Sequence, residues 1–261
     1  MVVEWPFVGT EALAAGVVNR YQLATRFEAI FRNVYVPKGQ AISPVDKAIG
    51  AWLWSQRRPT AAGLSAAALH GSRWIDAALP AELNQASRHK TKGILLSSEG
   101  LDNDEFCTVD GVTATTPVRT AFDLGRRRNR TTAVIRLDAL LQATGLDTRE
   151  VEALIARHRG ARGITQLREA VELADPGAES PQETRTRLVL TAAGLRPTHT
   201  QIEVFDSFDF VGRIDMRWPR WKVGVEYDGL QHWTNPGVRN RDIERQAELE
   251  ALGWRIIRVK F

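Results

Sequence analysis

The 261-residue sequence has very little cysteine, with Cys107 as its single example. A lone cysteine excludes an intrachain disulfide and a cysteine-rich zinc site. The sequence also lacks an apolar run long enough to cross a bilayer, and residues 2–6 lack the basic start and apolar centre of a signal peptide. We therefore expect no membrane partner and, as the default, a cytoplasmic location.

Composition otherwise fits a folded globular protein, because hydrophobic residues make up 43% and charged residues 25% of the chain. The formal net charge is +4, and the sequence pI is about 9.5. Mild basicity suits a polyanionic partner such as DNA without requiring one. The length allows two domains or one large domain.

The most informative segment runs from Val223 to His232. Its apolar and polar residues alternate, and side chains in a strand point to opposite faces with a period of two. A strand here places Glu226 and Asp228 on one face, with a glycine and a histidine just beyond. Two carboxylates on one strand repel each other unless a cation or hydrogen-bond donors meet them.

A third carboxylate comes from the preceding segment. Residues 208–218 also alternate, and Asp215 lies on the face opposite its apolar neighbours. The short connection at residues 219–221 contains a proline and predicts an antiparallel turn. Pairing of the two strands can bring Asp215 beside Glu226. The pattern predicts a site for Mg²⁺ or Mn²⁺ held by the oxygens of Asp215, Glu226 and Asp228.

The elements around this site form a recognisable series. Ser180, a proline and Glu183 form a capping box that begins a helix, which Gly194 ends. Further elements are expected as a strand at 201–204, the two strands of the acidic site, a helix at 239–252 and a strand at 254–259. The predicted order is αβββαβ.

The segment from about 178 to 259 resembles the nuclease domains related to very-short-patch repair endonucleases, in the PD-(D/E)XK superfamily. The matching residues are Glu183, Asp215, the Glu226-Tyr227-Asp228-Gly229 string, His232, Asp242 with Arg245, and Gly253-Trp254-Arg255. The resemblance implies a restriction-endonuclease-like α/β core and Mg²⁺-dependent cleavage of a nucleic acid. It also implies catalytic roles for Glu183, Asp215, Glu226, Asp228 and His232. One departure matters: Asp228 stands where the superfamily has lysine.

Each of these residues also has a structural interpretation. Glu183 fits a capping role alone, and His232 fits an ordinary loop histidine. Glu226 and Asp228 can form cross-strand ion pairs with Arg213 and Lys222. Asp242 and Arg245 are three residues apart on a helix, which favours a salt bridge, while Arg245 could instead reach a phosphate. Trp218, Trp221 and Trp233 are candidates to wall the site, and the basic run at 126–130 is expected to be a solvated turn.

The region before residue 176 is expected to be mostly helical, with the sequence Asp175-Pro176-Gly177 as a linker. Helices are expected at 11–15, 20–26 (capped by Asn19), 44–53, 65–69, 117–124, 132–144, 148–156 and 164–174, and strands at 30–36, 94–97 and 106–109. This divides the chain into residues 1–60, 61–175 and 176–261. The overall fold class is α/β, or α+β for the whole chain.

The N-terminal region has its own resemblance. Gly16-Val17-Val18, Tyr21-Gln22-Leu23 and Asn33-Val34-Tyr35-Val36 resemble the winged helix of AbiEi-type antitoxins, as do residues 61–71 and 116–124 of the middle region. The family's usual glycine is Asn33 here. The resemblance implies DNA binding through a recognition helix at 20–26, with Arg20, Tyr21, Gln22 and Arg26 as contacts.

Two functions follow as hypotheses. The first is a metal-dependent DNA endonuclease positioned by its N-terminal region, with Arg245 as a further nucleic-acid contact. The alternative is an antitoxin-type DNA-binding repressor whose nuclease-like domain is inactive, which Asp228 in the lysine position favours. A module that neutralises a cognate partner protein is a third possibility.

Overall fold

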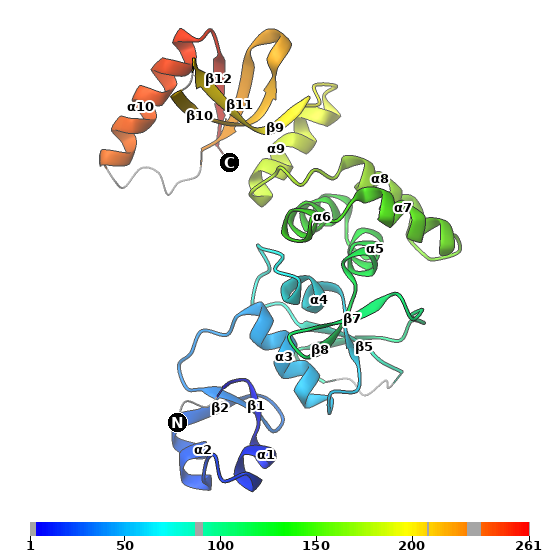
Figure 1. Ribbon diagram of the computed structural model, residues 1–261. Helices are drawn as coiled ribbons and strands as arrows, with labels where there is room; N and C mark the ends of the chain where they lie inside the picture. The colour runs from blue at the N-terminus through cyan, green and yellow to red at the C-terminus, as the bar shows by residue number, and fades with distance from the viewer. Residues whose placement is uncertain (1–3, 87–90, 208, 229–235, 261) are drawn as a thin grey trace.

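The computed structural model describes residues 4–86, 91–207, 209–228 and 236–260, with the side chains of 236–240 left aside. Ten α-helices and three β-sheets lie within these residues, which confirms the α+β class. Figure 1 shows the chain passing from a small N-terminal lobe through a central sheet and a group of helices to a C-terminal sheet. None of the described helices is both long and apolar enough to span a bilayer.

The N-terminal lobe consists of two short helices and a three-stranded sheet. Its elements are β1 (Phe7–Val8), α1 (Gly9–Ala14), α2 (Arg20–Arg26), β2 (Phe27–Phe31) and β3 (Val34–Pro37), with strand order β1-β3-β2. Asn19 caps α2 through a capping box with Gln22, as the sequence predicts. The single strand expected at 30–36 is wrong, because the chain turns between β2 and β3.

That turn explains the residue found in place of the family's glycine. Asn33 has φ 64°, in the left-handed region that asparagine tolerates better than other side chains. Its side chain also exchanges hydrogen bonds with Thr10, whose N–H donates to Oδ1 at 3.1 Å and whose Oγ1 accepts from Nδ2 at 2.9 Å. Asparagine therefore supplies the turn and also ties it to α1.

The first half of the middle region is a sheet rather than the mostly helical segment expected. Its strand order is β6-β5-β4-β8-β7. The elements are β4 (Thr60–Ala61), α4 (Gly63–Leu69), β5 (Ala81–Asn84), β6 (Ile94–Ser97), β7 (Phe106–Val109) and β8 (Val112–Thr115), and α3 (Pro44–Trp54), which precedes residue 60, packs on the same core. The sequence predicts β6 and β7 but not β4, β5 or β8.

Four helices follow, and the sequence predicts all of them. They are α5 (Pro117–Arg127), α6 (Arg130–Thr144), α7 (Thr148–Arg157) and α8 (Ile164–Leu173). Asn129 and Asp147 cap the starts of α6 and α7, and Gly145 ends α6 with φ 67°. Their apolar faces share one core that includes Phe122, Leu137 and Leu167.

The C-terminal region has the predicted αβββαβ order. It comprises α9 (Pro181–Ala192), β9 (His199–Asp206), β10 (Asp209–Trp218), a 3₁₀ turn (Pro219–Trp221), β11 (Val223–Tyr227), α10 (Pro236–Ala251) and β12 (Arg255–Val259). The sheet order is β12-β11-β10-β9. β10 and β11 are antiparallel across the 3₁₀ turn, whereas β11 and β12 are parallel, as a helical crossover allows.

The segment expected to be a linker is hydrogen-bonded to both of its neighbours. The Asp175 N–H donates to Oδ1 of Asp138 on α6 at 2.7 Å, and the Asp175 carboxylate accepts from Thr200 on β9 at 3.0 Å. Arg187 of α9 donates to Asp138 Oδ2 at 2.6 Å, and both side chains are buried. α9 is thus fixed to the helical core as well as to its own sheet.

Candidate functional site

Glu183 acts as a capping residue in the structure. Its backbone N–H donates to Ser180 Oγ, and its carboxylate accepts from the Ser180 hydroxyl at 2.8 Å and from the Glu179 N–H at 2.9 Å. In a capping box, the glutamate carboxylate accepts a hydrogen bond from the backbone N–H of the capping residue, here Ser180. In the structure it accepts instead from the N–H of Glu179, one residue earlier. Gln201 also donates to Glu183 Oε2 at 2.8 Å, which links the helix start to β9.

Asp215 lies between that helix start and the central strands. Its Oδ2 accepts from the Tyr227 N–H at 2.9 Å, and its Oδ1 accepts from Gln201 Nε2 at 3.3 Å. Burial, together with the nearby charges of Glu183 and Glu226, raises the pKa of Asp215 to about 6. The carboxylates that the sequence brings together are thus close enough to repel one another.

The cation that meets Glu226 is an arginine. Arg245 of α10 donates to both oxygens of Glu226, at 2.9 and 2.7 Å, and also to Asp242 at 3.1 Å. Glu226 is 8% exposed, so this two-pronged pair is largely shielded from water. The hydrogen bonds to Glu226 raise the pKa of Arg245. The predicted salt bridge between Asp242 and Arg245 is confirmed.

The other predicted site residues are placed less centrally. Asp228 pairs with Lys260 at 3.1 Å. His232 lies outside the described residues. The predicted cross-strand pairs with Arg213 and Lys222 are wrong, because Arg213 binds Glu179 at 2.6 Å and Lys222 donates to the Leu252 carbonyl at 2.8 Å.

The tryptophans expected to wall the acidic site do not share one location. Trp218 is 9% exposed and packs with Met216 and Val225. Trp221 is 63% exposed and belongs to the turn between β10 and β11. Trp233 lies outside the described residues.

As arranged, these carboxylates do not fit a divalent-cation site. Both oxygens of Glu226 are used by Arg245, Asp228 is paired with Lys260, and both oxygens of Asp215 accept protein hydrogen bonds. Mg²⁺ needs several free oxygen ligands in near-octahedral geometry. A guanidinium supplies the positive charge that the sequence pattern requires.

A different trio of metal-ligand type occurs in the middle region. Among the described residues, ligand atoms of Asp102, Glu105 and His158 lie within 4.8 Å of one another. Arginines already occupy these acids: Arg119 binds Glu105, and Arg157 donates to Asp102 at 2.7 Å. His158 lies 2.5 Å from Glu105. The trio is therefore part of an ion-pair network.

That network is centred on Arg119, a buried residue in the segment 116–124, for which the sequence predicts no role. Arg119 is 2% exposed and contacts Glu105, Asp123 and Glu99. Its neighbours in the basic run are also paired: Arg126 binds Asp123 at 2.8 Å and Arg127 binds Glu99 at 2.9 Å, and Arg128 pairs with Glu82. The prediction of a solvated turn at 126–130 is therefore wrong for these three arginines.

The predicted recognition helix presents its side chains outward. α2 has no buried residue, and Tyr21 is 77% exposed. Arg20 and Arg26 are also exposed, at the two ends of the helix. The side-chain oxygen of Gln22 already accepts a hydrogen bond from the Asn19 N–H at 2.9 Å, which leaves only its amide NH₂ for a DNA contact. An uncovered helix next to a β-hairpin is the geometry that winged-helix proteins present to a groove of DNA.

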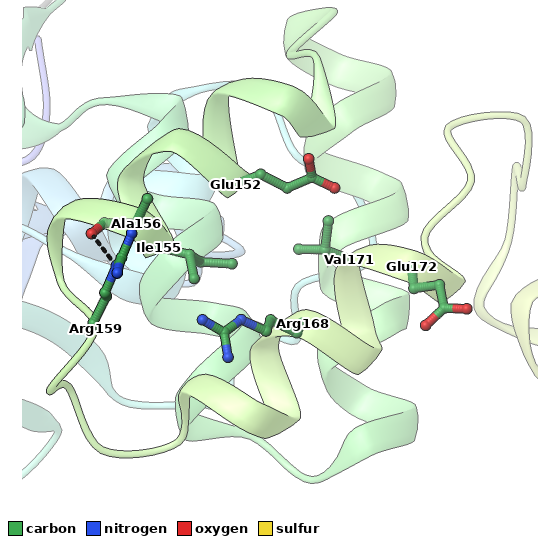
Figure 2. Close-up of a pocket in the computed structure, with 7 residues that line it drawn as sticks. All are labelled: Glu152, Ile155, Ala156, Arg159, Arg168, Val171 and Glu172. Carbon is green, nitrogen blue, oxygen red and sulfur yellow. Dashed lines mark hydrogen bonds between the residues drawn. The ribbon is translucent and has the colours of Figure 1, made fainter.

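A surface pocket of about 510 Å³ lies between α7 and α8. Figure 2 shows Ile155, Val171 and Arg168 pointing toward one another across it, while Arg159 folds back onto the Ala156 carbonyl. Glu152 and Glu172 complete the rim. The pocket is lined by the apolar side chains of Ile155 and Val171 and by charged side chains of both signs.

The acidic cluster gives a pH-dependent prediction for Asp215→Asn. The folded pKa of about 6 lies above the unfolded value of about 3.9, so wild-type stability falls as pH rises from about 4 through 6. Asparagine keeps an acceptor for the Tyr227 N–H and removes that charge. We expect the free energy of unfolding of Asp215→Asn to exceed that of wild type by about 1–2 kcal/mol near pH 7.5, a value reduced to allow for residual solvent exposure of Asp215. The difference should disappear near pH 4.

Urea denaturation at both pH values measures this change, with the exposed Asp209→Asn as the matched control. A variant that is less stable than wild type at both pH values would mean that the Asp215 charge is favourable where it lies.

Comparison with known proteins locates the family relationship in the middle of the chain. Residues 60–173 match the family model of the AbiEi antitoxin C-terminal domain. Two proteins of Mycobacterium tuberculosis that are described as uncharacterized, from strains CDC 1551/Oshkosh and H37Rv, are each 35% identical over 149 residues. The match covers 57% of this chain and 55% of each relative, so this chain spans about half the length of those relatives. No solved structure matches the chain significantly.

The antitoxin-like part of the sequence interpretation is thus supported by an independent match, whereas no comparison supports the resemblance to repair endonucleases.

Proposed function

We propose that this protein is a DNA-binding regulator of the antitoxin type, in which the N-terminal winged helix contacts duplex DNA. The observation that carries the proposal is α2, a capped helix with no buried side chain and with Arg20, Tyr21 and Arg26 exposed. Because α2 buries none of its side chains, they are available to contact a ligand. The antitoxin family match at residues 60–173 supports the same function.

The charge of the lobe suits this role. Arg20 and Arg26 provide phosphate contacts at both ends of α2, and Arg32 is exposed at the turn of the β2–β3 hairpin. Tyr21 provides an apolar face with a hydroxyl for a base edge or a sugar. The helix would then lie in the major groove, and the hairpin would contact the adjacent phosphate backbone.

A salt series tests the proposal. Arg20→Ala with Arg26→Ala is expected to weaken duplex binding and to flatten the dependence of log affinity on log salt by about 1.8, which is about 0.9 for each lost phosphate contact. Fluorescence anisotropy with a labelled duplex measures both quantities.

The matched control is Arg168→Ala with Arg185→Ala, which removes the same charge from two exposed positions on α8 and α9. Unchanged affinity and slope in the α2 variant, or equal losses in the control, would mean that this helix does not contact DNA.

A second candidate function is Mg²⁺-dependent DNA cleavage by the C-terminal region. The crowding of Glu183, Asp215 and Glu226 favours it, because clustered carboxylates with a raised pKa are common at functional sites. The bond between Arg245 and Glu226 and the pairing of Asp228 speak against it. We therefore infer a nuclease-like domain that does not cleave.

The inference is checked with supercoiled plasmid and Mg²⁺ or Mn²⁺. We expect no nicking by wild type. Nicking that Glu226→Gln abolishes in a folded protein would establish the endonuclease instead.

A further inference from the structure

One end of the C-terminal sheet brings together cations and tryptophans from two segments of the chain, residues 217–222 and 254–255. The register pairs Arg217 with His199 and Trp218 with Val223, and Val223 with Arg255 in turn. The start of β9, the end of β10, the starts of β11 and β12 and the 3₁₀ turn therefore lie at the same end. We call this surface the basic end; its residues are Arg217, Arg220, Trp221, Lys222, Trp254 and Arg255.

Among the residues that the structure describes, the charges at the basic end have no acidic partner. Residues 192–202, 216–225 and 251–261 contain no aspartate or glutamate. None of the four basic side chains forms a salt bridge with a carboxylate in the described part of the chain. The acids nearest the sheet lie at its other end, with Asp206 and Asp209 at the β9–β10 turn and Asp228, which pairs with Lys260, after β11.

The aromatic side chains lie among these cations. The Arg217 guanidinium stacks over Trp254 at 5.3 Å, and the Arg220 guanidinium lies 5.7 Å from the centre of the Trp221 ring. Trp221 is 63% exposed, a large apolar surface for a turn to leave in water. Arg217 Nε is buried and has no hydrogen-bond partner among the described residues.

The backbone holds this arrangement in place. Lys222 has φ 48°, and its Nζ donates to the Leu252 carbonyl at 2.8 Å. The Arg255 N–H donates to the Lys222 carbonyl at 2.8 Å. The turn is therefore fixed to the chain that enters β12, and Trp221 projects from a preformed surface. A fixed platform loses little conformational entropy when it binds a ligand.

We propose that the basic end binds single-stranded nucleic acid, with a base stacked on Trp221 and the adjacent phosphates bound by Arg220, Lys222 and Arg255. Unpaired cations follow a phosphate backbone, and an exposed indole offers the flat apolar face on which an unpaired base stacks. A duplex keeps its bases stacked on each other and cannot use that face. This site is separate from α2 and does not rest on the function proposed for that helix.

The test uses the full chain and a labelled oligothymidylate of about 15 nucleotides, with affinity measured by fluorescence anisotropy over a salt series. Trp221→Ala is expected to weaken binding about tenfold, whereas Trp221→Phe keeps most of the affinity because phenylalanine also stacks. Arg220→Ala with Lys222→Ala is expected to flatten the salt slope by about 1.4, or about 0.7 for each lost contact.

The chain supplies a matched control in Trp74→Ala. Trp74 is 46% exposed and has the Arg73 guanidinium 4.8 Å from its ring, but it belongs to the middle region. We expect this variant and Arg20→Ala with Arg26→Ala to bind oligothymidylate as wild type does. Oligouridylate of the same length shows whether ribose is accepted on the same surface.

Three results would overturn the proposal. Wild type fails to bind the oligonucleotide, or Trp221→Ala and Trp74→Ala bind it equally, or polyglutamate displaces it as well as unlabelled oligothymidylate does. The last result would identify a surface for acidic polymers in which the indole plays no part.

Discussion

Arg187→Ala is expected to lower the stability of the whole chain by about 3–5 kcal/mol near pH 7.5, because it leaves Asp138 charged and unpaired in the core. Both side chains of the pair are almost fully buried, at 3% and 2% exposure. Arg187 also donates to the Leu173 carbonyl, and Thr184 donates to Asp138 at 2.7 Å. The Asp138–Arg187 pair therefore joins α6 and α9, and the arginine also ties both to the end of α8.

The defect should depend on pH in a defined direction. Burial raises the pKa of Asp138 to about 6 even with Arg187 present, and loss of the arginine raises that pKa further. A folded pKa above the unfolded value means stability that is present at low pH and lost as pH rises through the folded pKa. The loss in Arg187→Ala should therefore shrink when denaturation is repeated near pH 5.

Arg185→Ala is the matched control, since it lies on the same helix but is exposed. Asp138→Leu with Arg187→Leu should recover much of the stability, because replacing both partners of a buried pair leaves no unpaired charge. A loss below about 1 kcal/mol in Arg187→Ala would show that α9 is not fixed to the helical core through this pair.

Local sequence signals predicted the elements that depend on near neighbours. Ser180, Asn19 and Gly194 mark helix ends through hydrogen bonds and backbone angles within a few residues, and each helix end they mark is present. The alternation in 208–218 and 223–228 identified β10 and β11 because each strand has a distinct apolar face. The missed strands differ from one another. β4 has two residues and pairs in parallel with β8 from far along the chain, and such pairing leaves no local pattern. β8 did have a local signal, because Asp110-Gly111 forms the two-residue turn of the β7–β8 hairpin with positive φ at both residues.

The candidate site shows the same division. The alternation of apolar and polar residues and the short turn at 219–221 were sufficient to predict that Asp215 lies close to Glu226. The local sequence did not show which cation meets these carboxylates. Arg245 lies 19 residues after Glu226 and reaches it only when α10 packs on the sheet. The basic end was missed for a related reason, since only the strand register brings Trp254 and Arg255 beside the cations of residues 217–222.

The second large loss of stability is expected when Arg245 is removed. Arg245→Ala should destabilise the protein by about 2–4 kcal/mol near pH 7.5, because it leaves Glu226 largely buried without its counter-ion; the lower part of this range reflects the 25% exposure of the Arg245 side chain. For a chain of this size, that corresponds to a fall of roughly 5–15 °C in melting temperature. Glu226→Gln should cost less, because glutamine still accepts one hydrogen bond and Asp242 still pairs with Arg245.

Glu244→Gln, on the exposed side of α10, is the control for loss of one negative charge. Addition of Mg²⁺ separates the two functional hypotheses for the same residues. If Arg245 is the permanent counter-ion of Glu226, the melting temperature of wild type should not respond to Mg²⁺, because the cation would have to displace a bidentate guanidinium. If Mg²⁺ raises it, or if Glu226→Gln melts higher than wild type in metal-free buffer, then the carboxylates repel one another as an unfilled metal site does, and the endonuclease hypothesis replaces the inactive domain.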